Sequence, residues 1–422
     1  MEKALGLECF LTESEGIDGK LKAEIRDFIV KERSFELPES ENGKYCVLRV
    51  KATNWETNSL ISLIAKKLRI SKNHVHIAGI KDKRAITEQL MVVKTEKEKI
   101  EDLKIKDVEI SFLYPTDKRL YLGNLYGNDF KIRVKECRNV DNVEFIKGEL
   151  TEKGGFPNYF GVQRFGVVRP NTHRIGKLIV KENYKNAVMT YLCEIGPFEG
   201  EEVASARKFL KESGDFKEGI KIFPRHLEFE RNLMAHLIEK PGDYAGALRN
   251  LPYSLKTIFV YAHQSYLFNR VLSRRMIDDL PLNKPLLGDI VVPLDRHKNP
   301  ENERVKVKDY NLEKIERNIE EGRCAITGAV FGYATMMAEG AQGQIERDIL
   351  EEESCDVNQF HIYGLPELSA AGLRRPLQVK TDIEHGTEDE STVLFRFSLP
   401  KGCYATSLMR EFMKSEDIRC YS

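Results

Sequence analysis

The chain has 422 residues, of which 41% are hydrophobic, and this length is enough for two or three domains with buried cores. Its 66 basic and 66 acidic residues leave no net charge, so a nucleic acid would have to bind to a local basic patch. The N-terminus does not resemble a signal peptide, and no apolar run has the length of a membrane span. We therefore expect a globular cytoplasmic protein without membrane association.

The first third alternates predicted strands with a few helices, which is typical of an α+β domain. Thr53 and Glu56 form a capping-box pattern before a helix predicted over residues 54–69. Apolar alternation predicts short strands around Val75 and in residues 89–94. A further strand from residue 130 would place three basic side chains on one face of a sheet, namely Lys131, Arg133 and Lys135.

The pattern changes after about residue 167. Residues 172–280 show mostly helical periodicity, and residues 286–345 combine short strands with glycine-rich stretches. The stretch IEHGTEDE, residues 383–390, predicts a polar hairpin loop, and strict alternation returns in residues 392–400. We therefore predict a discontinuous catalytic domain of residues 1–167 and 373–422, interrupted by an insertion domain of residues 168–372.

Several classes of chemistry are excluded by the motifs that are missing. The chain has no phosphate-binding P-loop, no dinucleotide-binding glycine turn, no zinc-protease helix and no nucleophile elbow. The eight cysteines form no Cys-x-x-Cys pair, which indicates reduced thiols rather than structural zinc. His74 and His76 alternate along a predicted strand, but the sequence places no third metal ligand beside them.

The stretch HIAGIKDKRAITEQ, residues 76–89, places one acid between two lysines where a predicted strand ends. Three interpretations are open: a solvated turn, a phosphate cradle, or a single carboxylate kept ionised for chemistry. In an extended backbone Lys81 and Lys83 would point to one side and Asp82 to the other. The lysines could then face phosphates, and a buried Asp82 would need a cation from elsewhere in the chain.

Two aromatic stretches also have two interpretations each. NYFGVQRFG, residues 158–166, is either a buried strand at a domain junction or a surface that stacks bases and binds phosphates. In GNDF, residues 127–130, Asn128 and Phe130 would share one side of a predicted strand. Phe130 taken alone is a core residue on this evidence.

Seven stretches in this order resemble the TruD family of tRNA pseudouridine synthases, in its archaeal type and with its eukaryotic relatives. They are GKLKAEIRDFIVKE (19–32), AGIKDKRAITEQ (78–89), GNDF (127–130), PNYFGVQRFG (157–166), AHQSYLFNRVL (262–272), GLRRPL (372–377) and LPKGCYATSLMREF (399–412). The family's Pro-Glu-Asp-Phe is replaced here by Ile-Arg-Asp-Phe at residues 25–28. The resemblance implies a catalytic domain with a mixed, largely antiparallel sheet and a family-specific α/β insertion.

The resemblance also implies a reaction and its residues. Asp82 would be the catalytic acid that isomerises uridine to pseudouridine, without metal or cofactor. Lys22 would be the cation beside it, Phe130 the ring that stacks on the target uracil, and Asn128 the side chain that orients the active-site loop.

The implied substrate is tRNA at uridine 13, and no obligate protein partner is expected. Candidate RNA contacts are Lys81, Lys83, Arg164, Arg374 and Arg375. The competing hypothesis from another class is a non-catalytic RNA-binding protein of the same fold, such as a tRNA chaperone.

Overall fold

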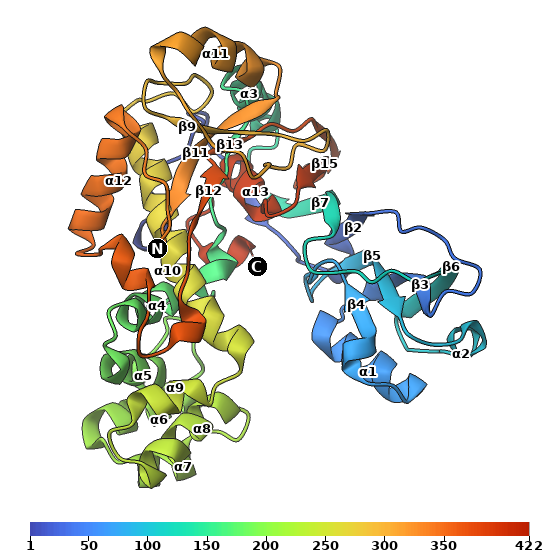
Figure 1. The fold of residues 1–422 in the computed structure, drawn as a ribbon, viewed down its shortest axis with the longest axis vertical. Helices are drawn as coiled ribbons and strands as arrows, with labels where there is room; N and C mark the ends of the chain where they lie inside the picture. The colour runs from blue at the N-terminus through green and yellow to red at the C-terminus, as the bar shows by residue number, and fades with distance from the viewer. Residues whose placement is uncertain (422) are drawn as a thin grey trace.

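The computed structural model describes residues 1–421 and contains one large sheet, whose strands come from both ends of the chain (Figure 1). Its order is β14-β15-β7-β2-β5-β3-β6, with β1 beside β7 and β4 beside β5. Strands β2 and β5 are parallel and the other neighbours are antiparallel, which confirms the predicted α+β fold with a mixed, largely antiparallel sheet. The strands are β1 (Asp18–Lys20), β2 (Phe28–Ser34), β3 (Tyr45–Thr53), β4 (Val75–Ile77), β5 (Ile86–Val93), β6 (Val108–Thr116), β7 (Leu125–Cys137), β14 (Ile383–Asp389) and β15 (Thr392–Pro400).

The two faces of β7 differ, as its alternating sequence predicts. Phe130, Ile132 and Val134 are buried in the core, together with the odd-numbered apolar residues of β15. Helices α3 (Asn142–Glu152) and α13 (Ala405–Met413) contribute to the same core. The opposite face of β7 carries the predicted row of basic side chains, Lys131, Arg133 and Lys135, none of which is buried.

Helix α1 (Thr57–Leu68) covers the other end of the sheet, where Leu60 and Ile64 are buried in a core shared with β3, β4 and β5. It is shorter than the predicted helix, because residues 54–56 form an irregular connection from the end of β3 to the helix start. The cap is Glu56, whose carboxylate accepts hydrogen bonds from the backbone of the first turn, so the predicted capping box is wrong in its residues. A short helix, α2 (Lys97–Glu101), precedes β6.

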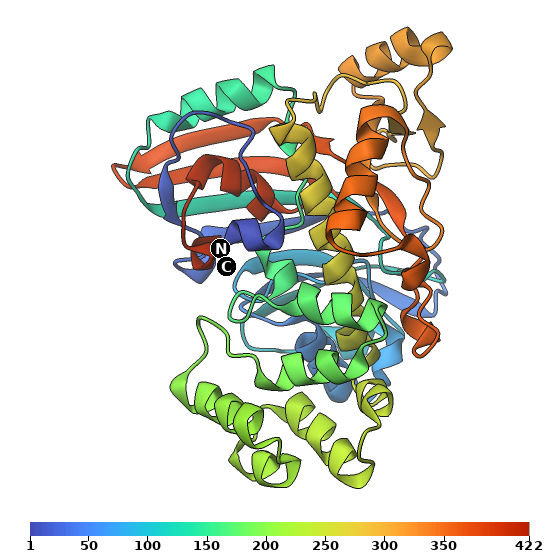
Figure 2. The same ribbon diagram turned by 90° about the vertical axis from the view of Figure 1, so that its left-hand side faces the viewer.

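The segment predicted as an insertion, called the insertion below, consists of helices and most of a four-stranded antiparallel sheet of order β10-β9-β11-β12. Helices α4 to α9 form a separate lobe, and the long α10 runs from this lobe toward the sheets (Figures 1 and 2). The elements are α4 (Thr172–Val180), α5 (Tyr184–Cys193), α6 (Glu201–Ser213), α7 (Phe216–Ile222), α8 (Glu228–Glu239), α9 (Tyr244–Arg249), α10 (Tyr253–Ile277), β9 (Ile290–Pro293), β10 (Val305–Lys306), α11 (Leu312–Glu320), β11 (Cys324–Val330), α12 (Gly340–Glu352) and β12 (Leu373–Pro376).

The chain leaves the insertion through β12 and returns to the large sheet. Because β12 pairs with β11, residues 373–376 belong to the same sheet as β9 and β11. The next strand, β13 (Gln378–Val379), pairs with β8 (Phe156–Pro157). The division of the chain into domains stays a prediction.

The stretch predicted as a polar hairpin loop is strand β14, so that prediction is wrong. It pairs with β15 along Ile383–Asp389 and forms the edge of the large sheet. Most of its side chains are exposed, which leaves no apolar alternation to indicate a strand.

The eight cysteines are free thiols, as expected. Within residues 1–421, no helix combines the length and the apolar character needed to cross a membrane.

Two buried histidines of the insertion should make stability depend on pH. Burial lowers the pKa of His173 to about 4 and that of His263 to about 3, against about 6.5 in the unfolded chain. The unfolded state therefore binds more protons below pH 6.5, and the free energy of unfolding should fall on acidification, by about 2 kcal/mol per histidine between pH 7 and pH 5.

Urea unfolding at the two pH values measures this effect. The variant His263→Leu should lose less stability between pH 7 and pH 5 than the wild type does. The matched control is His226→Leu, since His226 is exposed, and it should keep the wild-type pH dependence. Equal pH dependence in all three proteins would contradict the assignment.

Candidate active site

Asp82 lies in the irregular segment between β4 and β5, which connects two neighbouring strands of the large sheet. Its side chain is 46% exposed, so the carboxylate is open to solvent while its neighbours hold the backbone. Thr57, the first residue of α1, holds the backbone of Lys81, the residue before Asp82. Lys81 N–H donates to Thr57 Oγ1 at 3.0 Å, and Thr57 Oγ1 donates to the Lys81 carbonyl at 3.3 Å. The segment is not an extended strand, and Lys81 is buried whereas Lys83 is exposed, so the two lysines do not share a side as an extended backbone would predict.

Lys22 supplies the distant cation. Its Nζ donates to Asp82 Oδ1 at 3.0 Å, although 60 positions separate the two residues. The Lys22 side chain is 6% exposed, and its Nζ also lies 4.5 Å from the centroid of the Phe28 ring. Lys22 occupies a turn after β1 with φ of 53°, a conformation that costs a non-glycine residue about 1–2 kcal/mol.

Three aromatic side chains form a row of contacts that begins at Lys22 and runs across the large sheet. Phe28 and Phe130 meet edge to face with centroids 6.2 Å apart, and Phe130 stacks on Phe397 at 5.4 Å. Register places Val30 and Phe397 opposite Phe130 on the two neighbouring strands. Phe130 is 8% exposed, so it is a core residue with a small accessible part.

Asn128 lies on the same face of β7, two residues before Phe130 and opposite Glu32 of β2. Its Oδ1 is buried and has no hydrogen-bond partner among the described residues. A buried acceptor left unpaired costs about 1–3 kcal/mol, so this oxygen is available to a donor from outside the chain.

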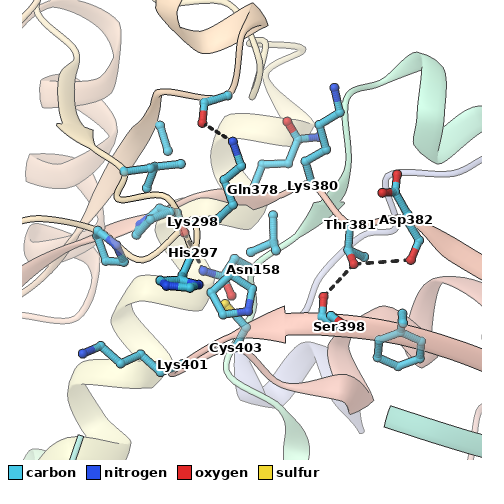
Figure 3. A pocket seen from close by; sticks show the side chains of 18 of the residues that line it. Asn158, His297, Lys298, Gln378, Lys380, Thr381, Asp382, Ser398, Lys401 and Cys403 are labelled. Atoms are coloured by element: carbon cyan, nitrogen blue, oxygen red, sulfur yellow. Dashed lines mark hydrogen bonds between the residues drawn. The ribbon is translucent and has the colours of Figure 1, made fainter. Parts of the chain in front are cut away.

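A cavity of about 970 Å³ lies between the large sheet and the insertion (Figure 3). Phe130 and Phe397 line it, whereas Asp82 and Lys22 do not. The loop that carries His297 contributes to its wall, as Figure 3 shows, together with the segment from Gln378 to Asp382. Phe130 thus lines the cavity and also contacts the Phe28 ring beneath Lys22, although its side chain lies on the opposite face of β7 from Lys131.

The cavity wall is rich in charged side chains, and of the basic ones that are not buried, Lys131 belongs to the row predicted from the sequence. Seven basic side chains that are not buried line it, against five acidic ones. This excess of positive charge suits a polyanion. The basic residues are Lys31, Arg33, Lys131, Lys298, Lys380, Arg396 and Lys401.

Register explains why several of these side chains meet. Lys31 lies opposite Asp129 and Asp129 opposite Ser398, while Lys131 lies opposite Arg396, so all share one sheet face. The basic row predicted on β7 therefore indicates, from the sequence alone, which face of the sheet lines the cavity. The contributions of the insertion could not be found in the same way, because they come from distant loops.

Three of the predicted RNA contacts have side chains that are buried and bound within the protein, which argues against a contact with phosphate. Lys81 Nζ lies 2.6 Å from Glu32 Oε2. Arg374 pairs with Glu346 at 2.7 Å. The guanidinium of Arg375 donates to Asn158 and to the Gly402 carbonyl. Burial lowers the pKa of both Arg374 and Arg375, which fits side chains withdrawn from solvent.

The other two predicted contacts remain open to solvent. Lys83 is exposed beside Asp82. Arg164 is half-buried, donates to Ser265 Oγ at 3.3 Å, and lies over the rings of Phe160 and Tyr261. Within residues 1–421, no cluster of three His, Cys, Asp or Glu side chains could hold a metal ion.

Comparison with known proteins decides the family. Residues 4–412 match the sequence model of the family described as tRNA pseudouridine synthase D (TruD). The chain belongs to this family. Its members convert uridine to pseudouridine, so the chain is an enzyme of the pseudouridine synthase class.

The similarity to relatives and to a solved structure extends over nearly the whole chain. Proteins called "Probable tRNA pseudouridine synthase D" from Methanosarcina mazei and Thermococcus sibiricus are each 39% identical to it, over 98% and 96% of this chain and 97% of theirs. One from Archaeoglobus fulgidus is 37% identical over 99% of this chain and 100% of its own. The crystal structure of the Methanosarcina mazei TruD protein superposes with a TM-score of 0.84 at 38% identity, covering 99% of this chain and 98% of that one.

Proposed function

We propose that this TruD protein isomerises uridine to pseudouridine in tRNA, at uridine 13, with Asp82 as the catalytic residue. The observation that carries the proposal is the contact of Asp82 with Lys22 at 3.0 Å, beside the paired rings of Phe28 and Phe130. A half-exposed carboxylate fixed by a buried ammonium is available to a substrate without losing its partner. A cytoplasmic location fits an enzyme of tRNA.

The reaction requires one ionised carboxylate. The bond between uracil N1 and ribose C1′ breaks, the base rotates, and a new bond joins C5 to C1′; the proton released from C5 is balanced by one gained at N1. Asp82 either attacks C1′ as a nucleophile or removes a proton from C2′ to give a glycal. In both routes Lys22 balances the charge of Asp82 and orients its carboxylate.

The target base must leave its stack to reach Asp82. Unstacking costs a few kcal/mol, and a contact with an aromatic ring offsets part of this cost. We assign that contact to the accessible part of Phe130, which Phe397 holds in place from one side. Asn128 then orients the active-site loop or accepts a hydrogen bond through its unpaired Oδ1.

The rest of the RNA would occupy the cavity between the sheet and the insertion. Its seven basic side chains are placed to contact phosphates from two sides of the cavity. Lys83 and Arg164 are the two remaining contacts from the sequence prediction, and both lie outside the cavity wall.

Incubation of the wild-type protein with an unmodified tRNA transcript, followed by mapping of pseudouridine, tests the proposal. Product at position 13 is the expected result. Product at another position would contradict the site but not the reaction. The competing hypothesis of a tRNA chaperone predicts binding of the transcript without product.

Removing the cation beside Asp82 should slow the reaction more than it weakens binding. We expect Lys22→Met to lower kcat by about 10- to 100-fold, because the carboxylate loses the group that orients it, while KM changes little. Lys20→Met is the matched control, since Lys20 is exposed two residues away, and it should keep wild-type kcat. A defect confined to RNA binding would refute the role of Lys22.

Replacing the stacking ring should affect a structured substrate most. We expect Phe130→Leu to lower kcat/KM on folded tRNA by about 10-fold, and less on a short single-stranded RNA whose target base is already unstacked. Phe145→Leu removes an exposed ring of α3 and serves as the control. Equal losses on both substrates would count against stacking on Phe130.

A further inference from the structure

Lys81, the residue before Asp82, is attached to the protein through its backbone and through its side chain. Thr57 binds both its N–H and its carbonyl, as described above. The Lys81 side chain turns into the protein, where it is 5% exposed, and its Nζ lies 2.6 Å from Glu32 Oε2. The lysine that flanks the catalytic residue is therefore an internal anchor.

Glu32 is the other half of this anchor. Its side chain is fully buried on β2, and Ser34 Oγ donates to its Oε1 at 2.7 Å. Strand β2 lies between β7 and β5, and Glu32 lies opposite Asn128. The anchor thus connects the segment around Asp82 to the centre of the large sheet, next to the side chains assigned to the substrate.

Gly79 leaves room for this contact. A Cβ at position 79 would lie 3.2 Å from Lys81 Nζ and 3.8 Å from both Glu32 Oε2 and Leu125 Cδ1. Any side chain larger than hydrogen would therefore press on the ammonium. The glycine and the first lysine of GIKDK have a common steric explanation that involves no phosphate.

We infer that Glu32 and Lys81 are positioning residues, which hold the segment before β5 so that the Asp82 carboxylate meets Lys22. Asp82 has no strand pairing of its own, and its carboxylate is half exposed. Its placement therefore depends on the neighbouring anchor, and a displacement of about 1 Å at a reacting group can cost about 100-fold in rate. The inference rests on the proposed role of Asp82 in the reaction.

A buried ion pair could instead serve stability alone, since breaking one leaves an uncompensated charge. The pair Arg275 and Asp289 provides the comparison. Its atoms lie 2.7 Å apart, both side chains are fully buried, and neither residue lines the cavity or contacts Asp82. A purely structural effect should look the same at both pairs.

The experiment compares kcat, KM and thermal stability for Lys81→Met, Glu32→Gln, their double variant, and Asp289→Asn. We expect kcat to fall by about 10- to 100-fold in each single variant with KM within about 3-fold. The double variant should lose no more than the worse single one, because the two residues act as a unit. Asp289→Asn should lose stability and keep kcat, and Lys81→Arg should recover part of the lost kcat.

Two results would overturn the inference. One is wild-type kcat in folded Lys81→Met protein; the other is a loss of kcat that follows thermal stability equally in all variants, Asp289→Asn included. If Lys81→Met does not fold, Glu32→Asp and Lys81→Arg carry the same comparison. A wild type that makes no pseudouridine would overturn the proposed function itself, whereas an active wild type with unaffected variants would overturn only the positioning role.

Discussion

Asp82→Asn protein is expected to leave uridine unconverted in a tRNA transcript that it still binds. The substitution keeps the shape of the side chain and removes its negative charge, which both possible routes require. Loss of such a group costs at least about 10²- to 10⁴-fold in rate. Because Asp82 is half exposed and its neighbours hold the backbone, the fold should not change.

The measurement pairs pseudouridine mapping with a binding assay on the same RNA. Asp348→Asn is a suitable control, since it removes one partly exposed carboxylate from α12 of the insertion, and it should convert the transcript as the wild type does. Loss of product with retained affinity would place the defect in the chemical step. Equal product from Asp82→Asn and the wild type would refute the catalytic role.

The sequence predicts those parts of the fold where one face is buried. Strands β7 and β15 alternate strictly because one face packs on α3 and α13 while the other faces the cavity or solvent. Helix α1 shows its buried stripe in the same way. Strand β14 lacks this signal because its backbone pairs with β15 while most of its side chains remain in solvent. A pairing made only by the backbone leaves no periodicity to detect.

The sequence pattern predicts less of the candidate site than of the fold. Nothing in the spacing of Lys22 and Asp82 indicates that they meet, and only the family resemblance supplied the pair. The buried position of Lys81 differs from the prediction because lysines are usually exposed and because the segment around it is not extended. Glu32 had a usable signal: it shares a strand face with Phe28 and Val30, and an acid on an apolar face requires a buried cation.

Arg374→Met separates a stabilising role of this buried arginine from the RNA contact that the sequence predicts. Its guanidinium donates to Glu346, which is fully buried and also accepts hydrogen bonds from Gln342 and the Ala338 backbone. Removing the arginine leaves this carboxylate buried without its counter-charge. We expect the free energy of unfolding to fall by about 3–5 kcal/mol, measured by urea unfolding.

The double variant Arg374→Met/Glu346→Gln should regain much of that stability, because no buried charge is left unpaired. The affinity of the folded single variant for tRNA should equal that of the wild type, since the arginine donates to Thr327, Met336 and Glu346 inside the protein. Lys401→Met offers the contrast: its exposed side chain lines the cavity, and it should weaken binding at unchanged stability. Weaker RNA binding by a fully stable Arg374→Met protein would contradict the structural role and restore this arginine as a phosphate contact.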